Sequence, residues 1–313
     1  MKIPKIKTKD LVDGTELSAE EILALFEFTA ELKNDLSKGR KHEYLAKKSL
    51  AMIFEKNSTR TRVSFETGIY QLGGQALFLS ANDIQISRGE PLSDTARVLS
   101  RYVDGIMIRT DKHEKAIKLA QESKVPVING LTDMYHPCQA LADMFTIYER
   151  QKSFKNVRLT YLGDGNNVAH SLLIICSLLG VDISVASPKG YQPDPDVTTI
   201  AQKLAASSGS GLAVTADIAK AVKGADYLYT DVWVSMGQEK EAAKRRKIFS
   251  SYKITRALLE KAAPDCLVMH CLPAHRGEEI DADVIDSERS IIFDQAENRL
   301  HTQKAVMCAL MKK

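Results

Sequence analysis

The sequence predicts an α/β fold with two domains, each a mostly parallel sheet with helices on both faces. Short apolar runs of strand length alternate with segments of helical periodicity along the chain. This alternation is typical of parallel sheets that are covered on both faces. The length of 313 residues is sufficient for two ordinary domains.

The first half opens with a helix and continues with four strands. Ser18 can cap the helix, and Glu21 completes a capping box ahead of an apolar stripe. Apolar residues from Phe65 onward follow helical spacing, so a second helix is expected to begin near Ser58 or Thr59. The expected strands are SLAMIF (49–54), QALFLS (75–80), GIMIRT (105–110) and VPVING (125–130).

The second half repeats the alternation, and we expect the domain boundary near residue 150, after a helix with the sequence CQALADMFTIYER. Helices are expected from Val168 and near residue 200. The apolar-periodic stretch after Arg299 predicts a C-terminal helix. The expected strands are NVRLTYL (156–162), DISVAS (182–187), ADYLYTDVW (225–233) and CLVMHCLP (266–273).

Composition and charge exclude several classes of protein. Lys and Arg number 43 and Asp and Glu number 40, and this near balance argues against a nucleic-acid or membrane-surface partner. The longest apolar run, SLLIICSLLG, is shorter than the roughly 18 residues that span a bilayer, and the first residues lack the apolar core of a signal peptide. Five scattered cysteines suggest reduced thiols and a cytoplasmic location. The chain has no CxxC or HxxxH pair, so no metal is expected.

The segment FEKNSTRTRVSFETG (54–68) crowds basic and hydroxyl side chains into one short window. A strand that passes through a polar turn into a helix directs backbone N–H groups and the positive end of the helix dipole at an anion. Arginine adds a planar set of donors that matches phosphate. A helix N-cap with solvated arginines is the alternative. The Walker A pattern is absent, so ATP is not the expected source of the phosphate.

A second polar turn, within TDMYHPCQALADMF (132–145), precedes another helix. His136 stands before Pro137, which favours an extended or turn backbone ahead of the helix. His136 and Gln139 are therefore expected at a second helix N-terminus. A structural histidine is the alternative.

Polar segments also follow the strands of the second half. GDGNNVAH (163–170) has Val168 at the third glycine position of a dinucleotide-binding turn, and no acid ends the next strand, so NAD binding is disfavoured. Asn167 remains as a polar group at a strand end, where ligands of α/β proteins bind. Asp231 of DVWVSMGQE could hold an ammonium group or form an Asx turn.

The segments KEAAKRRK (240–247) and HCLPAHRG (270–277) each allow two interpretations. KEAAKRRK fits a solvated helix face better than a nuclear-localisation cluster. Cys271 of HCLPAHRG follows a buried strand and lies beside His and Arg, which could activate its thiol. A buried cysteine is more often a small hydrophobic residue.

In their order and spacing, the motifs STRTR, RxSFE, HPCQ, DxWxSMG and HCLP resemble the aspartate/ornithine carbamoyltransferase family over essentially the full chain. STRTR and HPxQ are shared by the wider family, whereas DxWxSMG and HCLP are similar to the ornithine branch. The resemblance implies a domain for carbamoyl phosphate, 1–150 with a C-terminal helix 298–313 that packs back on it, and a domain for L-ornithine, 151–297. It also implies a homotrimer or an assembly of trimers with shared active sites, and a loop at SMG that moves as a lid.

The resemblance further implies the site residues. Those for carbamoyl phosphate are Ser58, Thr59, Arg60, Thr61, Gln85, Arg109, His136, Pro137, Cys138, Gln139, Cys271, Leu272 and Arg299. Those for ornithine are Asn167, Asp231, Ser235 and Met236. Arg109, His136 and Cys271 are the implied catalytic residues, and Gln85 is expected to reach in from a neighbouring subunit.

The implied reaction is direct attack of the ornithine δ-amine on carbamoyl phosphate, with neither a metal nor an organic cofactor. Asp231 with the SMG segment favours a free α-amino acid over the alternative acceptors putrescine and N-acetylornithine. An NAD-dependent dehydrogenase and a non-catalytic interaction module are the competing hypotheses from other classes.

Overall fold

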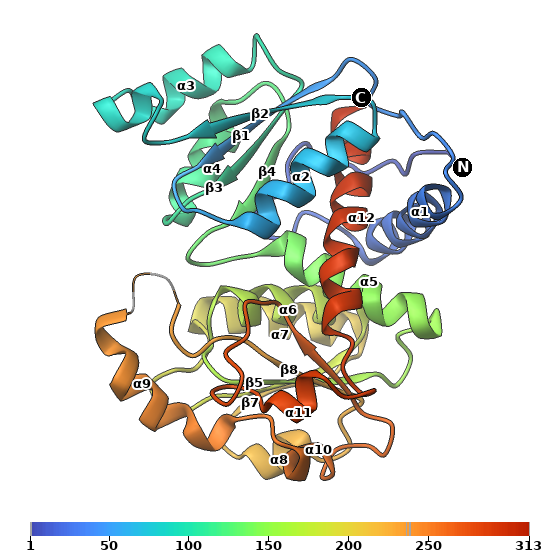
Figure 1. Cartoon of the computed structure of the whole chain (residues 1–313), viewed down its shortest axis with the longest axis vertical. Coiled ribbons are helices and arrows are strands. Elements are labelled where there is room, and N and C mark those ends of the chain that lie inside the picture. The colour runs from blue at the N-terminus through green and yellow to red at the C-terminus, as the bar shows by residue number, and fades with distance from the viewer. Residues whose placement is uncertain (1, 236, 238, 313) are drawn as a thin grey trace. The chain divides into compact units, whose positions relative to one another are not determined.

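The computed structural model describes residues 2–235, 237 and 239–312. The chain divides into two compact units. Unit 1 consists of Met1–Phe145 and Asn298–Lys313, and unit 2 consists of Thr146–Glu297. Each unit contains its own parallel sheet with helices around it (Figure 1), which confirms the predicted fold class.

Unit 1 is built on a four-stranded sheet with the order β2-β1-β3-β4, in which every pair is parallel. Its strands are β1 (Ser49–Phe54), β2 (Gln75–Ser80), β3 (Gly105–Arg109) and β4 (Val127–Leu131). Its helices are α1 (Ala19–Ser37), α2 (Thr59–Gln71), the 3₁₀ turn η1 (Gln85–Arg88), α3 (Leu92–Leu99), α4 (His113–Glu122), the first part of α5 (Pro137–Gln151) and the last part of α12 (Ile292–Met311).

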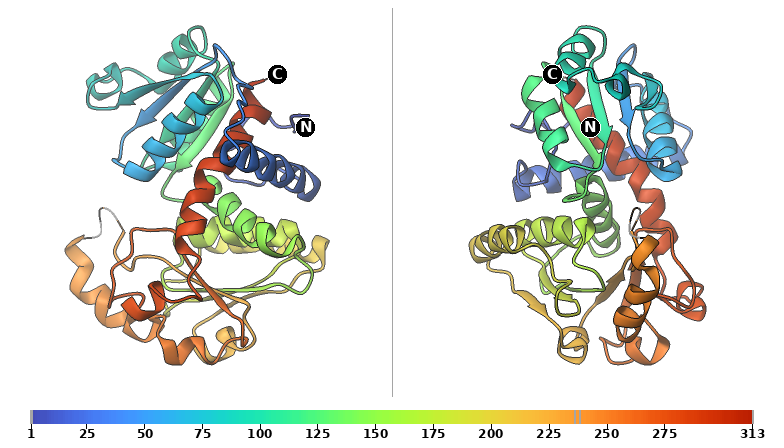
Figure 2. Two further views of the ribbon diagram at one scale, coloured as in Figure 1. Left: turned by 45° about the vertical axis from the view of Figure 1, so that its right-hand side comes forward. Right: turned by 90° about the vertical axis from the view of Figure 1, so that its left-hand side faces the viewer.

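Strands β1, β3 and β4 of this sheet are buried on both faces, whereas the edge strand β2 is only partly covered, and Figure 2 shows helices on the two sides of the sheet. On one face Ile53 and Ile106 pack in a cluster with Ala96 of α3 and Leu119 of α4. On the other face α12 comes so close to Gly105 that an added Cβ atom would lie 3.1 Å from the Met311 side chain. Burial on both faces explains why the strand sequences are almost continuously apolar.

The N-terminal segment protects an edge of the sheet. Leu11 N–H donates to the carbonyl of Val127 at 2.9 Å, and Asn129 N–H donates to the carbonyl of Leu11 at 2.8 Å. The segment therefore covers the β4 edge, which would otherwise expose unpaired backbone groups. No sequence pattern predicted this pairing, because a single paired residue leaves no periodicity.

Several expected elements of unit 1 are confirmed. The capping box of Ser18 and Glu21 is present, SLAMIF forms β1, and α2 begins at Thr59 with Ser58 as its N-cap. The C-terminal helix packs back on unit 1, where Lys33 Nζ donates to Asn298 Oδ1 at 2.8 Å. Its expected start after Arg299 was wrong, however.

The helix α12 begins at Ile292. Gln295 and Asn298 in its first turns are fully buried polar residues. The apolar pattern on which the prediction depended is therefore interrupted there, although the helix is continuous.

Unit 2 is built on a five-stranded parallel sheet with the order β7-β6-β5-β8-β9. Its strands are β5 (Arg158–Leu162), β6 (Asp182–Ala186), β7 (Leu212–Thr215), β8 (Tyr227–Thr230) and β9 (Leu267–His270). Its helices are α6 (Asn167–Leu179), α7 (Pro195–Ser208), α8 (Ile218–Val222), α9 (Ala242–Phe249), α10 (Arg256–Leu259), α11 (Ala282–Ile285) and the 3₁₀ turns η2 (Glu239–Glu241) and η3 (Ser250–Tyr252).

The strand β7 and the helix α6 of unit 2 differ in how far they are buried. The strand β7 was not predicted, because it is a short edge strand whose residues are only partly buried. The helix α6 is buried from Val168 to Ser177, as expected for the run SLLIICSLLG. Among the described residues, no helix combines the length and the hydrophobicity needed to cross a lipid bilayer.

The strand orders place one switch point in each sheet. In unit 1 strands β2 and β3 lie on opposite sides of β1, and in unit 2 strands β6 and β8 lie on opposite sides of β5, so the strand order reverses there. Ligands of open α/β sheets bind beyond the carboxyl ends of the strands at such points. The fold therefore directs attention to the residues that follow β1, β3, β5 and β8.

The turn after β5 is held by the close approach of another loop. An added Cβ atom at Gly165 would lie 2.1 Å from Pro193 N and 2.3 Å from Gln192 C, and Gly165 N–H donates to the Tyr191 carbonyl at 2.8 Å. Only glycine fits against this backbone.

Replacing Gly165 by alanine is expected to destabilise the protein by about 3 kcal/mol or more, because backbone atoms cannot move aside as a side chain can. Gly39→Ala is the control: Gly39 has φ +65° and nothing within 4 Å of the added Cβ, so only the left-handed conformation should cost about 1–2 kcal/mol. Denaturant unfolding measures both. Equal losses in the two variants would contradict the packing at Gly165.

Candidate functional site

The helix α2 follows strand β1, which lies at the switch point of the first sheet, and a capping side chain fixes its first turn. Ser58 is the N-cap, and its Oγ accepts from Thr61 N–H at 3.2 Å. The first turn of α2 carries no acidic residue, so nothing there offsets the positive end of the helix dipole. Thr59 and Arg60 are exposed at this end, whereas Thr61 is buried.

Arg109 joins this turn from the end of β3, on the other side of the switch point. Its Nη1 donates to Thr61 Oγ1 at 3.4 Å, and the side chain is buried. Burial, followed by the charges of Arg299 and Arg60, lowers the pKa of Arg109 to about 10. Within the described part of the chain, the buried Arg109 Nε has no hydrogen-bond partner. A buried cation with an unused donor fits an anionic ligand.

His136 belongs to the same electrostatic cluster. Its side chain is buried. Burial lowers its pKa well below the usual range, and Arg299, Arg109 and Arg60 lower it further. The imidazole is therefore neutral near pH 7 and can donate through only one nitrogen. The following residue, Pro137, is the first residue of α5, a position that suits proline.

Cys138 and Gln139, the other two residues of HPCQ, form hydrogen bonds inside unit 1. The Cys138 thiol donates to the Asn129 carbonyl at 3.4 Å, and burial raises its pKa to about 11. Gln139 Oε1 accepts from Arg299 Nη1 at 2.6 Å. The structure thus brings together Arg299 and Gln139, which lie far apart in the sequence.

Gln85 does not join this group within one chain. It lies exposed in η1, and none of its side-chain atoms is hydrogen-bonded to another predicted site residue in the described ranges. Arg62, the last basic residue of STRTR, is also separate: its Nε donates to Glu66 Oε1 at 3.0 Å, and its guanidinium lies 3.7 Å above the Phe78 ring.

In unit 2, a second cluster is centred on Asp231, directly after β8. Its carboxylate accepts from Asn166 Nδ2 at 2.7 Å, from the Cys271 thiol at 2.9 Å and from Val232 N–H at 2.8 Å. The last contact joins neighbouring residues, so it is not the Asx turn that was one interpretation of this segment, in which the carboxylate would accept from the N–H two residues on. Asp231 is buried, so its negative charge is focused at the switch point between β5 and β8.

The sequence pattern predicts Asn167 as a site residue, but the side chain that contacts Asp231 is that of its neighbour Asn166. Asn166 is the N-cap of α6, and its Oδ1 accepts from Val168 N–H and Ala169 N–H at 3.0 and 3.2 Å. Asn167 is the first residue of α6 and is half-buried. The preference of asparagine for N-caps was the signal that could have identified Asn166.

Ser235, which is also predicted for ornithine, lies in the loop after Asp231. Ser235 is half-buried in this loop. Met236 lies outside the described residues, so the structure does not place it.

The HCLP turn after β9 is held by two buried residues, His270 and Glu279, that were not among the predicted site residues. His270 Nδ1 accepts from Leu272 N–H at 2.9 Å, so its proton is on Nε2, which lies 3.0 Å from Glu279 Oε1. Both side chains are fully buried. The contacts hold Leu272 at φ 59°, a conformation that needs such support in a residue other than glycine.

The donor atoms of Asp231, His270 and Cys271 lie within 4.8 Å of one another, a spacing that a metal ion could use. Both nitrogens of His270 are already engaged by Leu272 and Glu279. This set therefore does not fit a metal site without rearrangement of the HCLP turn.

Residues 240–247 are only in part the solvated helix face that was expected. Arg245 of α9 is buried, donates from Nε to the Trp233 carbonyl at 2.5 Å, and pairs through Nη2 with Asp164. Its guanidinium lies 5.0 Å from the Tyr191 ring and 5.2 Å from the Phe249 ring. The expectation was wrong for Arg245 because its partner Asp164 is 81 residues away in the sequence. The local sequence of α9 does not reveal such a contact.

We call these contacts of Arg245 the Arg245 brace. They fix the start of the loop that follows Asp231 and tie it to the turn after β5. Burial raises the pKa of Asp164 to about 6, although Arg245 opposes the shift. The native state therefore binds this proton more tightly than the unfolded chain, and stability falls as pH rises from about 4 to about 6.

The variant Arg245→Met is expected to cost about 3 kcal/mol at pH 8, because it leaves a buried carboxylate without its cation. The loss should be smaller at pH 5, where Asp164 can accept a proton. Thermal unfolding of the variant across this pH range measures the effect. The control Asp164→Asn should remove the dependence between pH 4 and 6, and an unchanged pH dependence would contradict the assignment.

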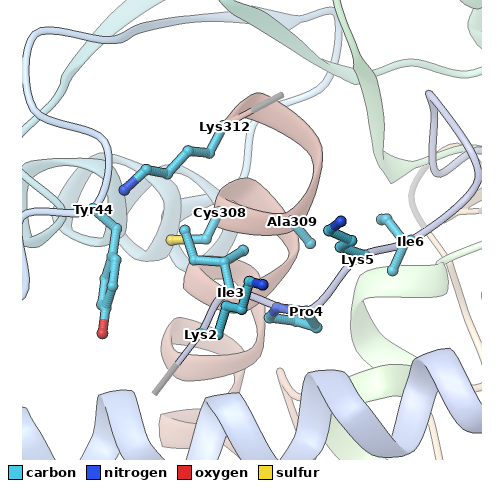
Figure 3. A pocket seen from close by; sticks show the side chains of 9 residues that line it. All are labelled: Lys2, Ile3, Pro4, Lys5, Ile6, Tyr44, Cys308, Ala309 and Lys312. Carbon is cyan, nitrogen blue, oxygen red and sulfur yellow. The ribbon is translucent and has the colours of Figure 1, made fainter.

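A cavity of about 550 Å³ lies elsewhere in unit 1 (Figure 3). It is lined by Lys2, Ile3, Pro4, Lys5, Ile6, Tyr44, Cys308, Ala309 and Lys312. The lining is aliphatic with lysines at the rim, and it includes none of the predicted site residues. Its size alone does not make it the functional site.

Known proteins are similar to this chain in sequence and in fold. Residues 9–149 match the family domain described as "Aspartate/ornithine carbamoyltransferase, carbamoyl-P binding domain". Residues 155–310 match "Aspartate/ornithine carbamoyltransferase, Asp/Orn binding domain".

Curated relatives are similar over nearly their whole length. The ornithine carbamoyltransferase of Thermococcus kodakarensis is 54% identical over 97% of this chain and 96% of its own. That of Bacillus subtilis is 54% identical over 97% of this chain and 94% of its own.

Solved structures agree. An ornithine carbamoyltransferase from Pyrococcus furiosus superposes with a TM-score of 0.94 at 54% identity, covering 97% of both chains. One from Gloeobacter violaceus gives a TM-score of 0.88 at 44% identity, covering 98% of this chain and 99% of that one. This chain belongs to the aspartate/ornithine carbamoyltransferase family.

Proposed function

We propose that the protein transfers the carbamoyl group of carbamoyl phosphate to the δ-amino group of L-ornithine, giving L-citrulline and phosphate. The observation that carries this proposal is the cluster of Arg60, Arg109 and Arg299 around a neutral His136 at the start of α2. The positive charges of the three arginines repel one another, and a bound anion would offset this repulsion. Arg109 Nε offers a hydrogen-bond donor to that anion.

We assign carbamoyl phosphate to the first predicted domain, 1–150 with 298–313. Backbone N–H groups of the first turn of α2 and the Arg60 guanidinium would hold the phosphate. Thr61, Arg109 and His136 would donate to the carbonyl oxygen. Ser58, Thr59, Pro137, Cys138 and Gln139 would shape the pocket, and the resemblance to the family assigns Cys271 and Leu272 to carbamoyl phosphate as well.

We assign ornithine to the second domain, 151–297. The Asp231 carboxylate suits the α-ammonium group, since it is buried at the carboxyl end of β8 and accepts hydrogen bonds from Asn166 and Cys271 that fix its position. Asn167, Ser235 and Met236 would hold the α-carboxylate end and the chain. The free α-amino acid distinguishes this acceptor from putrescine and N-acetylornithine.

The chemistry follows from these groups. The uncharged δ-amine attacks the carbonyl carbon, a C–N bond forms, and negative charge develops on the oxygen. The bond between the carbonyl carbon and the bridging oxygen then breaks, phosphate leaves with that oxygen and the electron pair, and the attacking nitrogen loses one proton. Fixed donors to the developing oxyanion are worth about 100- to 1000-fold in rate each, and alignment of the two reactants contributes roughly 7–11 kcal/mol.

Three further proposals follow the family rather than this chain's geometry. We propose a homotrimer or an assembly of trimers in which Gln85 reaches a neighbouring subunit's site, which suits its exposed position. We propose a cytoplasmic location. We place the reaction in arginine biosynthesis, as the P. furiosus relative is named an anabolic enzyme.

The acceptor can be tested by carbamoyl transfer with ornithine, putrescine, aspartate and N-acetylornithine. Ornithine should give the highest kcat/KM by at least about 100-fold, because the others leave buried polar groups unpaired. Arg109→Met is the matched control, and it should lose about 100-fold or more in kcat. Faster transfer to another amine would overturn the assignment of ornithine, and equal activity of the control would point to a contaminating enzyme.

Cys271 is proposed to position or deprotonate the δ-amine. Its thiol donates to Asp231, so it can pass a proton to that carboxylate. Cys271→Ala is expected to lower kcat by about 100-fold or more and to move the pH profile, whereas Cys271→Ser, which keeps a donor to Asp231, should retain more activity. Unchanged turnover and pH profile in the alanine variant would show that the thiol has no such role.

The competing dehydrogenase hypothesis is disfavoured by the turn after β5. In a dinucleotide fold the second glycine lets the pyrophosphate approach the backbone. Here that face of Gly165 is already occupied by the backbone of Gln192 and Pro193.

A further inference from the structure

Gln303 lies on α12 four residues after Arg299 and is fully buried. In the amide orientation that satisfies both of its ends, its oxygen accepts from Arg299 Nε at 3.2 Å and Nη2 at 2.8 Å. Its nitrogen donates to Ser64 Oγ at 2.6 Å and to the Arg299 carbonyl at 3.2 Å. Gln303 therefore connects the Arg299 guanidinium to α2, the helix whose first turn holds Ser58 and Thr61.

A second amide holds the same guanidinium from α5. Gln139 Oε1 accepts from Arg299 Nη1 at 2.6 Å, and Gln139 Nε2 donates to Asp143 Oδ1 at 2.7 Å. A carboxylate only accepts, so Asp143 determines which end of the Gln139 amide faces Arg299. Oxygen atoms from two helices thus fix the plane and the rotation of one guanidinium.

Both partners of the guanidinium in this network are neutral. An amide oxygen orients a guanidinium without cancelling its charge, whereas a carboxylate forms an ion pair with it. The charge of Arg299 remains effective, since it lowers the pKa of His136 and of Arg109. A carboxylate at position 303 would instead compete with any anion for Arg299.

The close contact between α2 and α12 makes this arrangement possible. An added Cβ atom at Gly68 would lie 3.1 Å from Met307 Cε and 3.3 Å from Lys304 Cγ. Figure 1 shows α12 passing alongside α2. Gln303 can reach Ser64 because a glycine lies one turn further along the facing helix.

We propose that Gln303 is a positioning residue for carbamoyl transfer, which orients Arg299 toward carbamoyl phosphate through its amide oxygen and does not itself neutralise the arginine's charge. Gln303 acts through Arg299 and does not contact the substrate. The inference rests on the proposed function and deepens it, and nothing in the motifs of the chain marks this residue.

The experiment compares Gln303→Met and Gln303→Glu in the full chain, with steady-state kinetics for each substrate and calorimetric binding of inorganic phosphate. Gln303→Met keeps the shape of the side chain and removes the oxygen. It should lower kcat/KM for carbamoyl phosphate by about 10- to 100-fold, the range for a hydrogen bond to a charged group. Gln303→Glu is isosteric, and its carboxylate should weaken phosphate binding more than the methionine does. The KM for ornithine should change by less than about twofold in both.

The matched control is Lys304→Met, the neighbouring buried residue on the same helix. Lys304 Nζ contacts His42 Nε2 at 3.1 Å and Gln71 Oε1 at 2.9 Å, and burial lowers its pKa to about 8. The variant removes polar contacts between α12 and its neighbours without touching Arg299. It should lower the Tm and leave the KM for carbamoyl phosphate within about twofold.

The outcomes distinguish a failure of the positioning role of Gln303 from a failure of the proposed carbamoyl transfer. Parental KM and phosphate affinity in Gln303→Glu would overturn the positioning role, as would an equal rise in KM in Lys304→Met. If Gln303→Met fails to fold, the isosteric glutamate variant still decides the question. If the parental protein binds phosphate but transfers no carbamoyl group, the proposed function fails, and the phosphate affinities of the variants still test the orientation of Arg299.

Discussion

The site in unit 1 depends on one electrostatic constraint, the burial of like charges beside a histidine. Arg109 and Arg299 are buried near each other, and Arg60 adds a third positive charge at the surface. Each charge disfavours the others and disfavours protonation of His136. The packed protein must hold them in place against this repulsion, and Thr61, Gln139 and Gln303 are neutral side chains that do so. These three contacts orient the guanidinium groups without adding negative charge beside them.

The sheet topology explains how distant segments produce this cluster. A parallel sheet places the carboxyl ends of neighbouring strands at one edge, so the turn after β1 and Arg109 at the end of β3 meet at the switch point. Unit 2 uses the same geometry for the opposite charge. Asp231 follows β8, Asn166 follows the neighbouring β5, and the carboxylate is surrounded by donors. Both sheets thus place their charged residues at the carboxyl ends of neighbouring strands. The positive cluster suits the anionic carbamoyl donor, and the negative one suits the cationic end of the carbamoyl acceptor.

Buried polar contacts that were not predicted as site residues give both clusters their shape. His270 and Glu279 hold the HCLP turn, the Arg245 brace holds the loop after Asp231, and Gln303 holds Arg299. A buried polar group is costly unless it is satisfied, so each of these side chains is restricted to one arrangement. That restriction is what pre-organises the groups proposed to contact the substrates.

The sequence by itself determined the fold class, most strands, the start of α2 and the segments in which the site residues lie, because strand length, helical period and capping are local properties. It did not reveal β7, the first turns of α12, Asn166 at the Asp231 cluster, or the buried state of Arg245. Only the tertiary structure decided which polar side chains meet. Arg299 and Gln139, or Arg245 and Asp164, are distant in the chain and adjacent in space, and a contact of that kind has no local pattern from which it could be predicted.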